Sequence, residues 1–167
     1  MVRMDDLRSL FRDCGLSDVK TYIQSGNAIF SSDDEPGALR DLLSDAFEKK
    51  FGFHSDVVLR TADDMSAVMS NWPFAESDII EAEANAPDVE HVHIYFSNDH
   101  IDNAALEKIY RSYEGKDKIY ASERELYLLC YQSIWNSKLA NMLTKLPVSL
   151  TARNQKTVRK LCELLAG

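Results

Sequence analysis

Long apolar runs, paired cysteines and an excess of positive charge are all missing from this chain of 167 residues. No apolar run approaches the roughly 20 residues that a membrane helix requires. The first residues, Met1–Asp6, also lack the apolar core of a signal peptide. The sequence therefore predicts a cytoplasmic protein with no membrane partner.

Cysteine is scarce, and its spacing carries no metal or redox motif. The three cysteines are Cys14, Cys130 and Cys162, and no two of them form a CxxC pair. An odd number of widely spaced cysteines favours buried free thiols over a disulfide. His91 and His93 would share one face of a strand, but no third ligand stands at a defined spacing from them. We expect neither a metal site nor a cofactor.

Positive charge is confined to the C-terminal end of the chain. The formal net charge is −8, yet the segment from Gln132 onward holds six cations and one anion, so the preceding residues carry −13. Long-range attraction of the whole molecule to nucleic acid is therefore not expected. The C-terminal segment could still form a local cationic face.

Apolar periodicity and turn residues predict helices and short strands in both halves of the chain. In the first half they predict a helix over 4–14, a hairpin of strands 19–24 and 28–32, a helix between Pro36 and Gly52, a strand over 56–60 and a helix after Thr61. In the second half they predict a strand over 91–96, a helix over 103–113, a hairpin of strands 117–122 and 125–131, a helix over 136–145, a short strand within 147–153 and a helix over 154–165. The acidic stretch 76–90 between them is interpreted as a solvated connection or a short helix.

The two halves repeat one pattern. The apolar residues of the first helix recur 99 positions later, as in the pairs Leu7/Leu106 and Phe11/Tyr110. The apolar residues that follow Arg60 recur 93 positions later, after Arg153, as in the pairs Val68/Leu161 and Trp72/Leu165. We expect all of these paired positions to be buried. The second half has the β-α-β-β-α-β order of a ferredoxin-like fold followed by a helix, and the first half lacks the opening strand.

The sequence thus predicts an α+β protein of two tandem ferredoxin-like units, residues 1–75 and 91–167, joined by the acidic connection 76–90. The opening strand is central in such a sheet, so the first unit should have an unpaired strand edge. That edge could recruit a strand from the other half or from a second chain, and self-association is one open possibility. We also expect a chain extended upstream by a loop and a strand to be more stable.

Four motifs resemble those of the bacterial domain-of-unknown-function 1697 family, in the same order along the chain. They are Met4-x-x-Leu7-Arg8, Thr21-Tyr22-Ile23-Gln24-Ser25-Gly26-Asn27, Ser137-Lys138-Leu139 and Thr151-Ala152-Arg153-Asn154-x-x-Thr157. The resemblance implies duplicated ferredoxin-like units and no established activity. Family members usually begin with a strand and an Arg-Gly-Ile-Asn-Val-Gly-Gly type loop just before the segment that starts here at Met4, and both are absent here.

Three groups of polar residues could carry function. Arg153, Asn154 and Lys156 would form an anion-attracting helix start, or an ordinary helix cap with a paired arginine. Ser137 and Lys138 open the preceding helix and could lie beside them if the loops share one end of the sheet. The turn Gln24-Ser25-Gly26-Asn27 is either a binding loop or a tight turn.

Aromatic residues and enzyme motifs add no further candidates for a functional site. Trp135, Tyr131, Tyr22 and Tyr120 are expected in the core and not as stacking platforms for nucleic acid. No nucleophile elbow, phosphate-binding loop or dinucleotide motif is present, so no enzyme class is assigned.

The leading hypothesis is a binding module for a small anionic ligand or a protein partner. The alternatives are an enzyme for a phosphorylated or nucleotide-like substrate, and weak nucleic-acid binding by the C-terminal basic segment.

Overall fold

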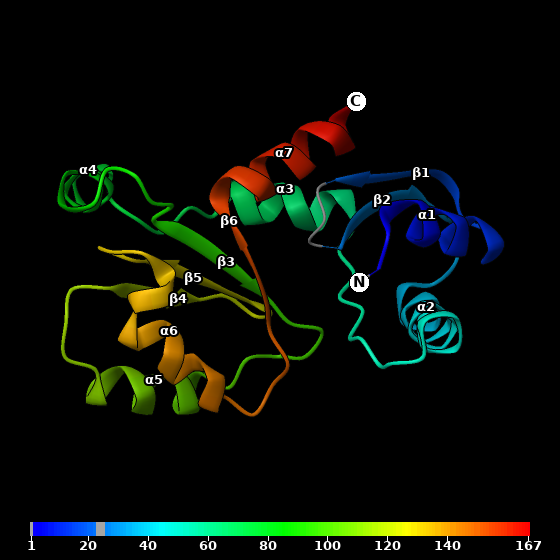
Figure 1. Cartoon of the computed structure of the whole chain (residues 1–167). Coiled ribbons are helices and arrows are strands. Elements are labelled where there is room, and N and C mark those ends of the chain that lie inside the picture. Colours follow the sequence, from blue (N-terminus) through cyan, green and yellow to red (C-terminus); the bar gives the residue numbers. More distant parts are fainter. Residues whose placement is uncertain (1, 23–25) are drawn as a thin grey trace. The chain divides into compact units, whose positions relative to one another are not determined.

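The computed structural model describes residues 2–22 and 26–167 and divides the chain into two compact units. The first unit contains the chain up to Thr61 together with residues 161–167, and the second contains residues 62–160 (Figure 1). Within the described residues, no helix combines the length and apolar character needed to span a membrane.

The first unit contains two helices and a hairpin: α1 (Met4–Asp13), β1 (Ser17–Tyr22), β2 (Asn27–Ser31) and α2 (Pro36–Phe51). Helix α1 buries Leu7, Leu10 and Phe11, at the spacing that places them on one face. Helix α2 begins where the Glu35 carboxylate accepts hydrogen bonds from two backbone N–H groups, and it ends at Gly52, whose φ is 78°. The apolar faces of α1 and α2 share one core with residues of β1. These elements confirm the predicted helix, hairpin and helix.

The sheet of the first unit contains β1 and β2, paired antiparallel, and no further strand among the described residues. The predicted strand over 56–60 is wrong, because residues 54–61 are in neither a helix nor a strand. Val57 and Leu59 nevertheless pack on the core of this unit. A strand needs a neighbour with which its backbone can pair, and apolar alternation alone does not supply one.

The second unit is built around a four-stranded sheet. Its elements are α3 (Ala62–Ser70), α4 (Glu76–Asn85), β3 (Val92–Phe96), α5 (Asn103–Ser112), β4 (Lys118–Ala121), β5 (Glu125–Leu129), η1 (Ile134–Asn136), α6 (Lys138–Met142), η2 (Leu143–Lys145), β6 (Thr151–Asn154) and the start of α7 (Gln155–Ala166). The strand order is β4-β5-β3-β6, with every neighbouring pair antiparallel. Strand β3 is therefore internal, which agrees with its run of buried residues.

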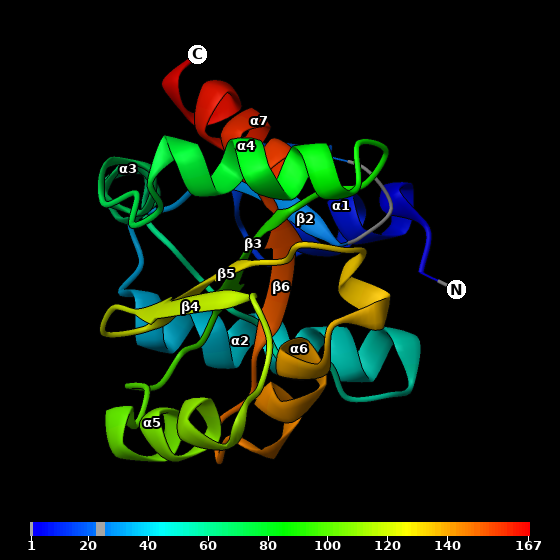
Figure 2. The ribbon, with the colours of Figure 1, turned by 90° about the vertical axis from the view of Figure 1, so that its left-hand side faces the viewer.

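Helices cover both faces of this sheet (Figures 1 and 2). On one face, Leu126 and Leu128 of β5 share a core with Leu106 of α5 and Leu139 of α6. On the other face, the Tyr127 hydroxyl donates a 2.8 Å hydrogen bond to a carbonyl of α3, that of Val68. We call these the α6 face and the α3 face of the sheet.

The predicted helix over 136–145 is wrong as a single element. The extended backbone of Ser137, with φ −77° and ψ 116°, separates η1 from α6, and the chain continues as a third short helix, η2. The Ser137 hydroxyl caps α6 by accepting a hydrogen bond from the Ala140 N–H. Helical periodicity does not detect such an interruption, because the buried positions remain three and four residues apart.

Two expectations about burial are also wrong. Leu7 and Leu106 are both buried, but Phe11 is buried whereas its counterpart Tyr110 is 41% exposed and stacks on Tyr113. Among the aromatic residues expected in the core, Tyr131 is buried but Tyr120 is 46% exposed and Trp135 is 91% exposed. Among the remaining paired positions, Val68 is buried and the other three are half-buried: Leu161, Trp72 and Leu165. Residue type predicts burial only on average, so single aromatic residues such as Tyr110, Tyr120 and Trp135 can be exposed.

Candidate functional site

The junction of β6 and α7 holds three of the predicted site residues. As predicted, Asn154 caps α7, because its Oδ1 accepts a 2.8 Å hydrogen bond from the Thr157 N–H. The half-buried Arg153 turns back along its own strand, and its Nη1 donates to the Thr151 hydroxyl and to the Ala152 carbonyl. Burial lowers the pKa of the Arg153 guanidinium from its ordinary value. Lys156 is exposed.

Ser137 and Lys138 stand at the start of α6. The Ser137 hydroxyl is buried and donates a 2.7 Å hydrogen bond to Oδ2 of Asp117, while it accepts the capping bond described above. Lys138 is exposed. The hydroxyl therefore has an internal function, and the lysine is open to solvent.

The sheet separates these two groups. Ile94 of β3 stands directly opposite both Tyr127 and Arg153 in the ladder, so the three residues share one face of the sheet. Tyr127 bonds to α3, which makes this the α3 face. Helix α6 packs on the opposite face. The structure thus does not bring Arg153 together with the helix that begins at Ser137 and Lys138.

The polar turn Gln24–Asn27 belongs to the first unit, and Gln24 and Ser25 lie outside the described residues. Gly26 has a φ of 78°, as a tight turn requires. The amide of the buried Asn27 donates a 3.2 Å hydrogen bond to the Tyr22 carbonyl, across the start of the hairpin. Asn27 therefore has a structural role in the turn.

Asp117 is a buried polar residue that sequence reasoning missed. It is 2% exposed, and its carboxylate accepts hydrogen bonds from the Tyr131 N–H at 2.9 Å, the Gln132 amide at 2.8 Å and the Ser137 hydroxyl at 2.7 Å. Its own N–H donates to the Tyr113 hydroxyl. This network joins the start of β4, the end of β5 and the start of α6. An aspartate before a strand is an ordinary turn residue, so the sequence carries no signal for its burial.

The three cysteines are free thiols, but only Cys130 is buried as predicted, and none is an activated thiolate. Burial, followed by the charge of Asp117, raises the pKa of the fully buried Cys130 to about 12. Burial likewise raises the pKa values of the half-buried Cys14 and Cys162. Within the described ranges 2–22 and 26–167, no three metal-ligating side chains come together.

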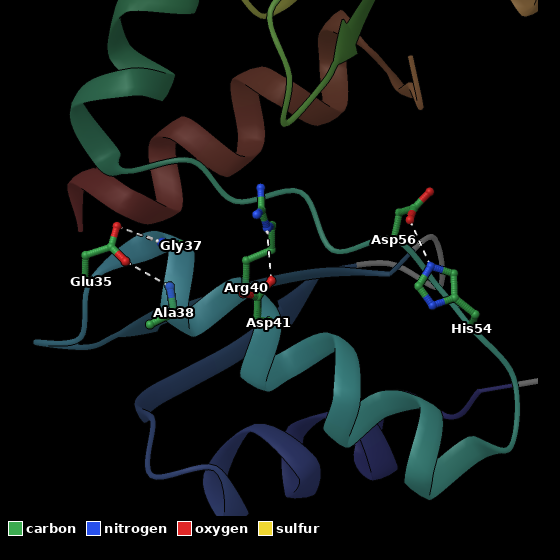
Figure 3. Close-up of polar contacts among 7 residues, drawn as sticks. All are labelled: Glu35, Gly37, Ala38, Arg40, Asp41, His54 and Asp56. Carbon is green, nitrogen blue, oxygen red and sulfur yellow. Dashed lines mark hydrogen bonds and ion pairs between the residues drawn. The ribbon is translucent and has the colours of Figure 1, made fainter. Parts of the chain in front are cut away.

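Figure 3 shows polar contacts of the first unit at the start of α2, within it and in the segment that follows it. The Glu35 carboxylate caps the helix, and Arg40 lies 3.6 Å from Asp41. His54 lies 3.0 Å from Asp56, and this hydrogen bond is the main cause that raises the pKa of the histidine. The side chains of His54 and Asp56 are 61% and 54% exposed, so solvent screens the interaction between them. The Glu35 contact fixes the start of α2, and none of these contacts encloses a ligand.

Trp135 is the most exposed large hydrophobic residue among the described residues. This residue is 91% exposed and lies three residues before the exposed Lys138. Lys145, seven residues after Lys138, is also exposed, and no acidic residue occurs between Gln132 and Cys162. We call Trp135, Lys138 and Lys145 the Trp135 surface. It combines an apolar group with positive charge on a molecule whose net charge is −8.

Comparison with known proteins gives a family but no activity. The family model described as "Protein of unknown function (DUF1697)" matches residues 1–127. No match was found among curated proteins. Among solved structures, the chain is similar to the conserved bacterial protein SP0830 from Streptococcus pneumoniae, with 25% identity and a TM-score of 0.76 over 100% of this chain and 91% of that one. The chain therefore belongs to the DUF1697 family, whose function is unknown.

Proposed function

We propose that this protein is a binding module whose Trp135 surface recognises an acidic segment of a partner protein. The exposure of Trp135, at 91%, is the observation that carries the proposal. A large aromatic side chain in water gains free energy when a partner covers it, and tryptophan is enriched among the residues that dominate binding. The neighbouring lysines favour a negatively charged partner and oppose a positively charged one.

Internal hydrogen bonds favour a protein partner over a small anion. The hydroxyl of Ser137, Nη1 of Arg153 and Oδ1 of Asn154 are all bonded within the chain. A small anion bound by the Ser137 hydroxyl or by Nη1 of Arg153 would have to replace their present bonds, at a cost of about 1 kcal/mol or more for each. An acidic peptide on the Trp135 surface replaces none of them.

A fluorescence titration tests the proposal. Replacement Trp72→Phe leaves Trp135 as the single tryptophan of the chain. We expect an acidic peptide with one apolar anchor to change the Trp135 emission saturably, and a basic peptide of the same length to leave it unchanged. Lys138→Glu/Lys145→Glu in the same background should weaken binding at least tenfold. The control is Lys20→Glu/Lys49→Glu, an equal charge change at exposed lysines of the first unit.

Inorganic phosphate and a nucleotide triphosphate form two further arms of that titration. Saturable binding of either that is lost in Arg153→Ala and kept in Trp135→Ala would replace our proposal with a small-anion site at the start of α7. No response to any of the ligands would overturn both hypotheses. Nucleic acid is not a favoured partner, because the whole chain is acidic.

We further propose that the chain holds two copies of one ferredoxin-like unit. Helices α1 and α5 each span ten residues and differ in position by 99, while α3 and α7 begin 93 positions apart. Each copy also holds an antiparallel hairpin after its first helix, in which Lys20 faces Ile29 and Lys118 faces Leu129, so the second hairpin is longer by two residues. The strand order β4-β5-β3-β6, with the first and third strands in the centre, is that of a split βαβ unit.

Two arginines add to the case for duplication. Arg60 and Arg153 occupy matching positions, and in each the Nη1 donates a 2.8 Å hydrogen bond to the carbonyl of the preceding residue. An experimental structure in which α1, β1 and β2 superpose on α5, β4 and β5, with the strands running in the same directions, would support the duplication. Strands that run in opposite directions in the two hairpins would overturn it.

We also propose a cytoplasmic location, since three free cysteines suit a reducing compartment.

A further inference from the structure

His91 is a buried histidine, directly before β3, with a backbone carbonyl against each of its ring nitrogens. Its Nδ1 is 2.6 Å from the Cys130 carbonyl, just beyond β5, and its Nε2 is 2.7 Å from the Ala86 carbonyl, just beyond α4. The residue is 6% exposed. All three residues belong to the second unit. The ring therefore bridges the end of α4 and the end of β5.

The two carbonyl partners define the charge of this ring. A carbonyl oxygen only accepts hydrogen bonds, so each ring nitrogen must carry a hydrogen to bond to it. A neutral imidazole carries one N–H, and its bare nitrogen would direct a lone pair at the second oxygen. Both distances are also short, as is typical of a charged donor. The two contacts are therefore satisfied together only when His91 is an imidazolium.

The end of α4 favours a cation at this position. Ala86 is the C-terminal cap of the helix, and the carbonyls at a helix C-terminus attract positive charge. The last turn of α4 carries the exposed Glu83, and the exposed Glu90 directly precedes His91. Both carboxylates add to the attraction for a positive charge.

His93, two residues along the chain, is the titratable neighbour that opposes this charge. Its Nε2 lies 3.1 Å from a single carbonyl, that of Glu90, so a neutral ring with one N–H satisfies this contact. Burial is the main cause that lowers the pKa of His93, and the charge of His91 lowers it further. Beyond β5, burial followed by the charge of Asp117 raises the pKa of Cys130 to about 12, so its thiol is neutral. The two histidines therefore hold one positive charge, and it belongs to His91.

Helix α4 is attached to the second unit mainly by polar contacts. Of its ten residues, Ala82 alone is buried. Beside the bond of His91, these contacts join Asp78 to Lys118, Glu81 to Lys116 and the Asn85 amide to the Tyr131 carbonyl. The pair of Glu81 and Lys116 is open to solvent and so stabilises little. Each remaining bond at the end of α4 therefore matters for how firmly that end is held.

We propose that His91 is a pH-sensitive latch: as an imidazolium it bonds the end of α4 to the end of β5, and loss of its proton releases one of these two bonds. A neutral ring keeps a single N–H, so one carbonyl is left without its donor. The end of α4 then opens more often, while the ion pair of Asp78 with Lys118 still holds the start of the helix. This latch does not depend on what binds at Trp135.

Nitrogen-15 NMR of the full chain with labelled histidine reports the charge directly. An imidazolium gives two similar resonances, both from protonated nitrogens, whereas a neutral ring gives two widely separated ones. At about pH 7.5, above the ordinary histidine pKa of about 6.5, we expect the first pattern for His91 and the second for His93. Sequential assignment connects each ring to its own backbone, so the unaltered chain is enough. A neutral His91 ring at this pH would overturn the proposal.

Hydrogen exchange at the same pH tests the latch. The Ala86 N–H bonds to the Ala82 carbonyl in the last turn before the latch. We expect it to exchange at least about tenfold faster in His91→Gln, because a hydrogen bond to a charged group is lost. The control His93→Gln keeps a donor for its single carbonyl and should leave this exchange unchanged. Equal exchange in His91→Gln and in the unaltered chain would overturn the proposal.

A pH titration of the unaltered chain replaces the variant if His91→Gln does not fold. As the His91 ring loses its proton, the Ala86 N–H should exchange faster than the rise in pH alone explains. An exchange rate that follows only the intrinsic pH dependence would overturn the latch.

Discussion

Three hydrogen bonds of the second unit converge on the buried carboxylate of Asp117. Replacement Asp117→Ala would leave the Tyr131 N–H, the Gln132 amide and the Ser137 hydroxyl without their acceptor. Each unsatisfied buried group costs about 1–3 kcal/mol, so we expect a loss of about 3 kcal/mol or more in the free energy of unfolding. Urea denaturation measures it. The exposed Asp88→Ala should change the midpoint little, and equal midpoints for the two variants would contradict the assigned role.

His93 gives the second unit a defined response to acid. Burial of this residue lowers the pKa of its imidazole, so the folded state holds it neutral at a pH where the unfolded chain binds a proton. Because the unfolded state binds more protons, stability should begin to fall when the pH drops below about 6.5, the ordinary pKa of histidine. The fall should continue until the pH passes the lowered pKa that His93 has in the folded state. Urea midpoints of the unaltered chain and of His93→Gln between pH 7 and pH 5 test this, and the variant should show the flatter profile.

An exposed histidine supplies the matched comparison. The control substitution is His100→Gln, at a surface position. Parallel profiles for all three proteins would assign the acid sensitivity to other groups.

Sequence reasoning at this scale succeeded where a residue acts on its near neighbours. The cap formed by Asn154 on Thr157 spans three positions, and residue type with position was enough to predict it. The bond from Ser137 to Asp117 spans 20 positions and depends on how two elements dock. The exposure of Trp135 likewise depends on where η1 ends, which residue type does not encode.

Helix α7 depends at its start on the Asn154 cap. We expect Asn154→Ala to lower the free energy of unfolding by about 1 kcal/mol, the usual cost of a lost cap, in the absence of any ligand. Thermal or urea unfolding measures this effect. Asn136→Ala, at an exposed position without a capping bond to a helix among the described residues, is the control. A cap variant as stable as the control would show that Asn154 is free to serve another purpose.

Elements with strong local signals were predicted to within a few residues, whereas those that depend on pairing were not. The sequence-predicted helix over 4–14 is α1, because an apolar face and acidic first turn both mark it. The hairpins are marked by their turns. The strand predicted over 56–60 is absent, and the region 136–145 forms three short helices. Both outcomes depend on contacts with residues far away in the sequence, which local periodicity does not reveal.

On the scale of the whole molecule, α3 belongs to the second compact unit although the repeat assigns it to the first. Met65 and Val68 of this helix are buried, and Tyr127 bonds to it. A fragment of residues 62–167 should therefore be more stable than one of residues 91–167 by several kcal/mol, at about 1.5–3 for each large buried side chain. Urea denaturation of the two fragments measures the difference, and equal midpoints would show that α3 contributes little to this unit.

Both tryptophans of the chain, Trp72 and Trp135, lie in the second unit, and they differ in exposure. Intrinsic fluorescence excited at the indole band is thus an optical probe of that unit alone, whereas far-ultraviolet circular dichroism averages the helices of both. If the units unfold independently, the two spectroscopic transitions fall at different denaturant concentrations. If they unfold as one cooperative body, the curves coincide, and a single emission spectrum then reports the fate of the entire chain.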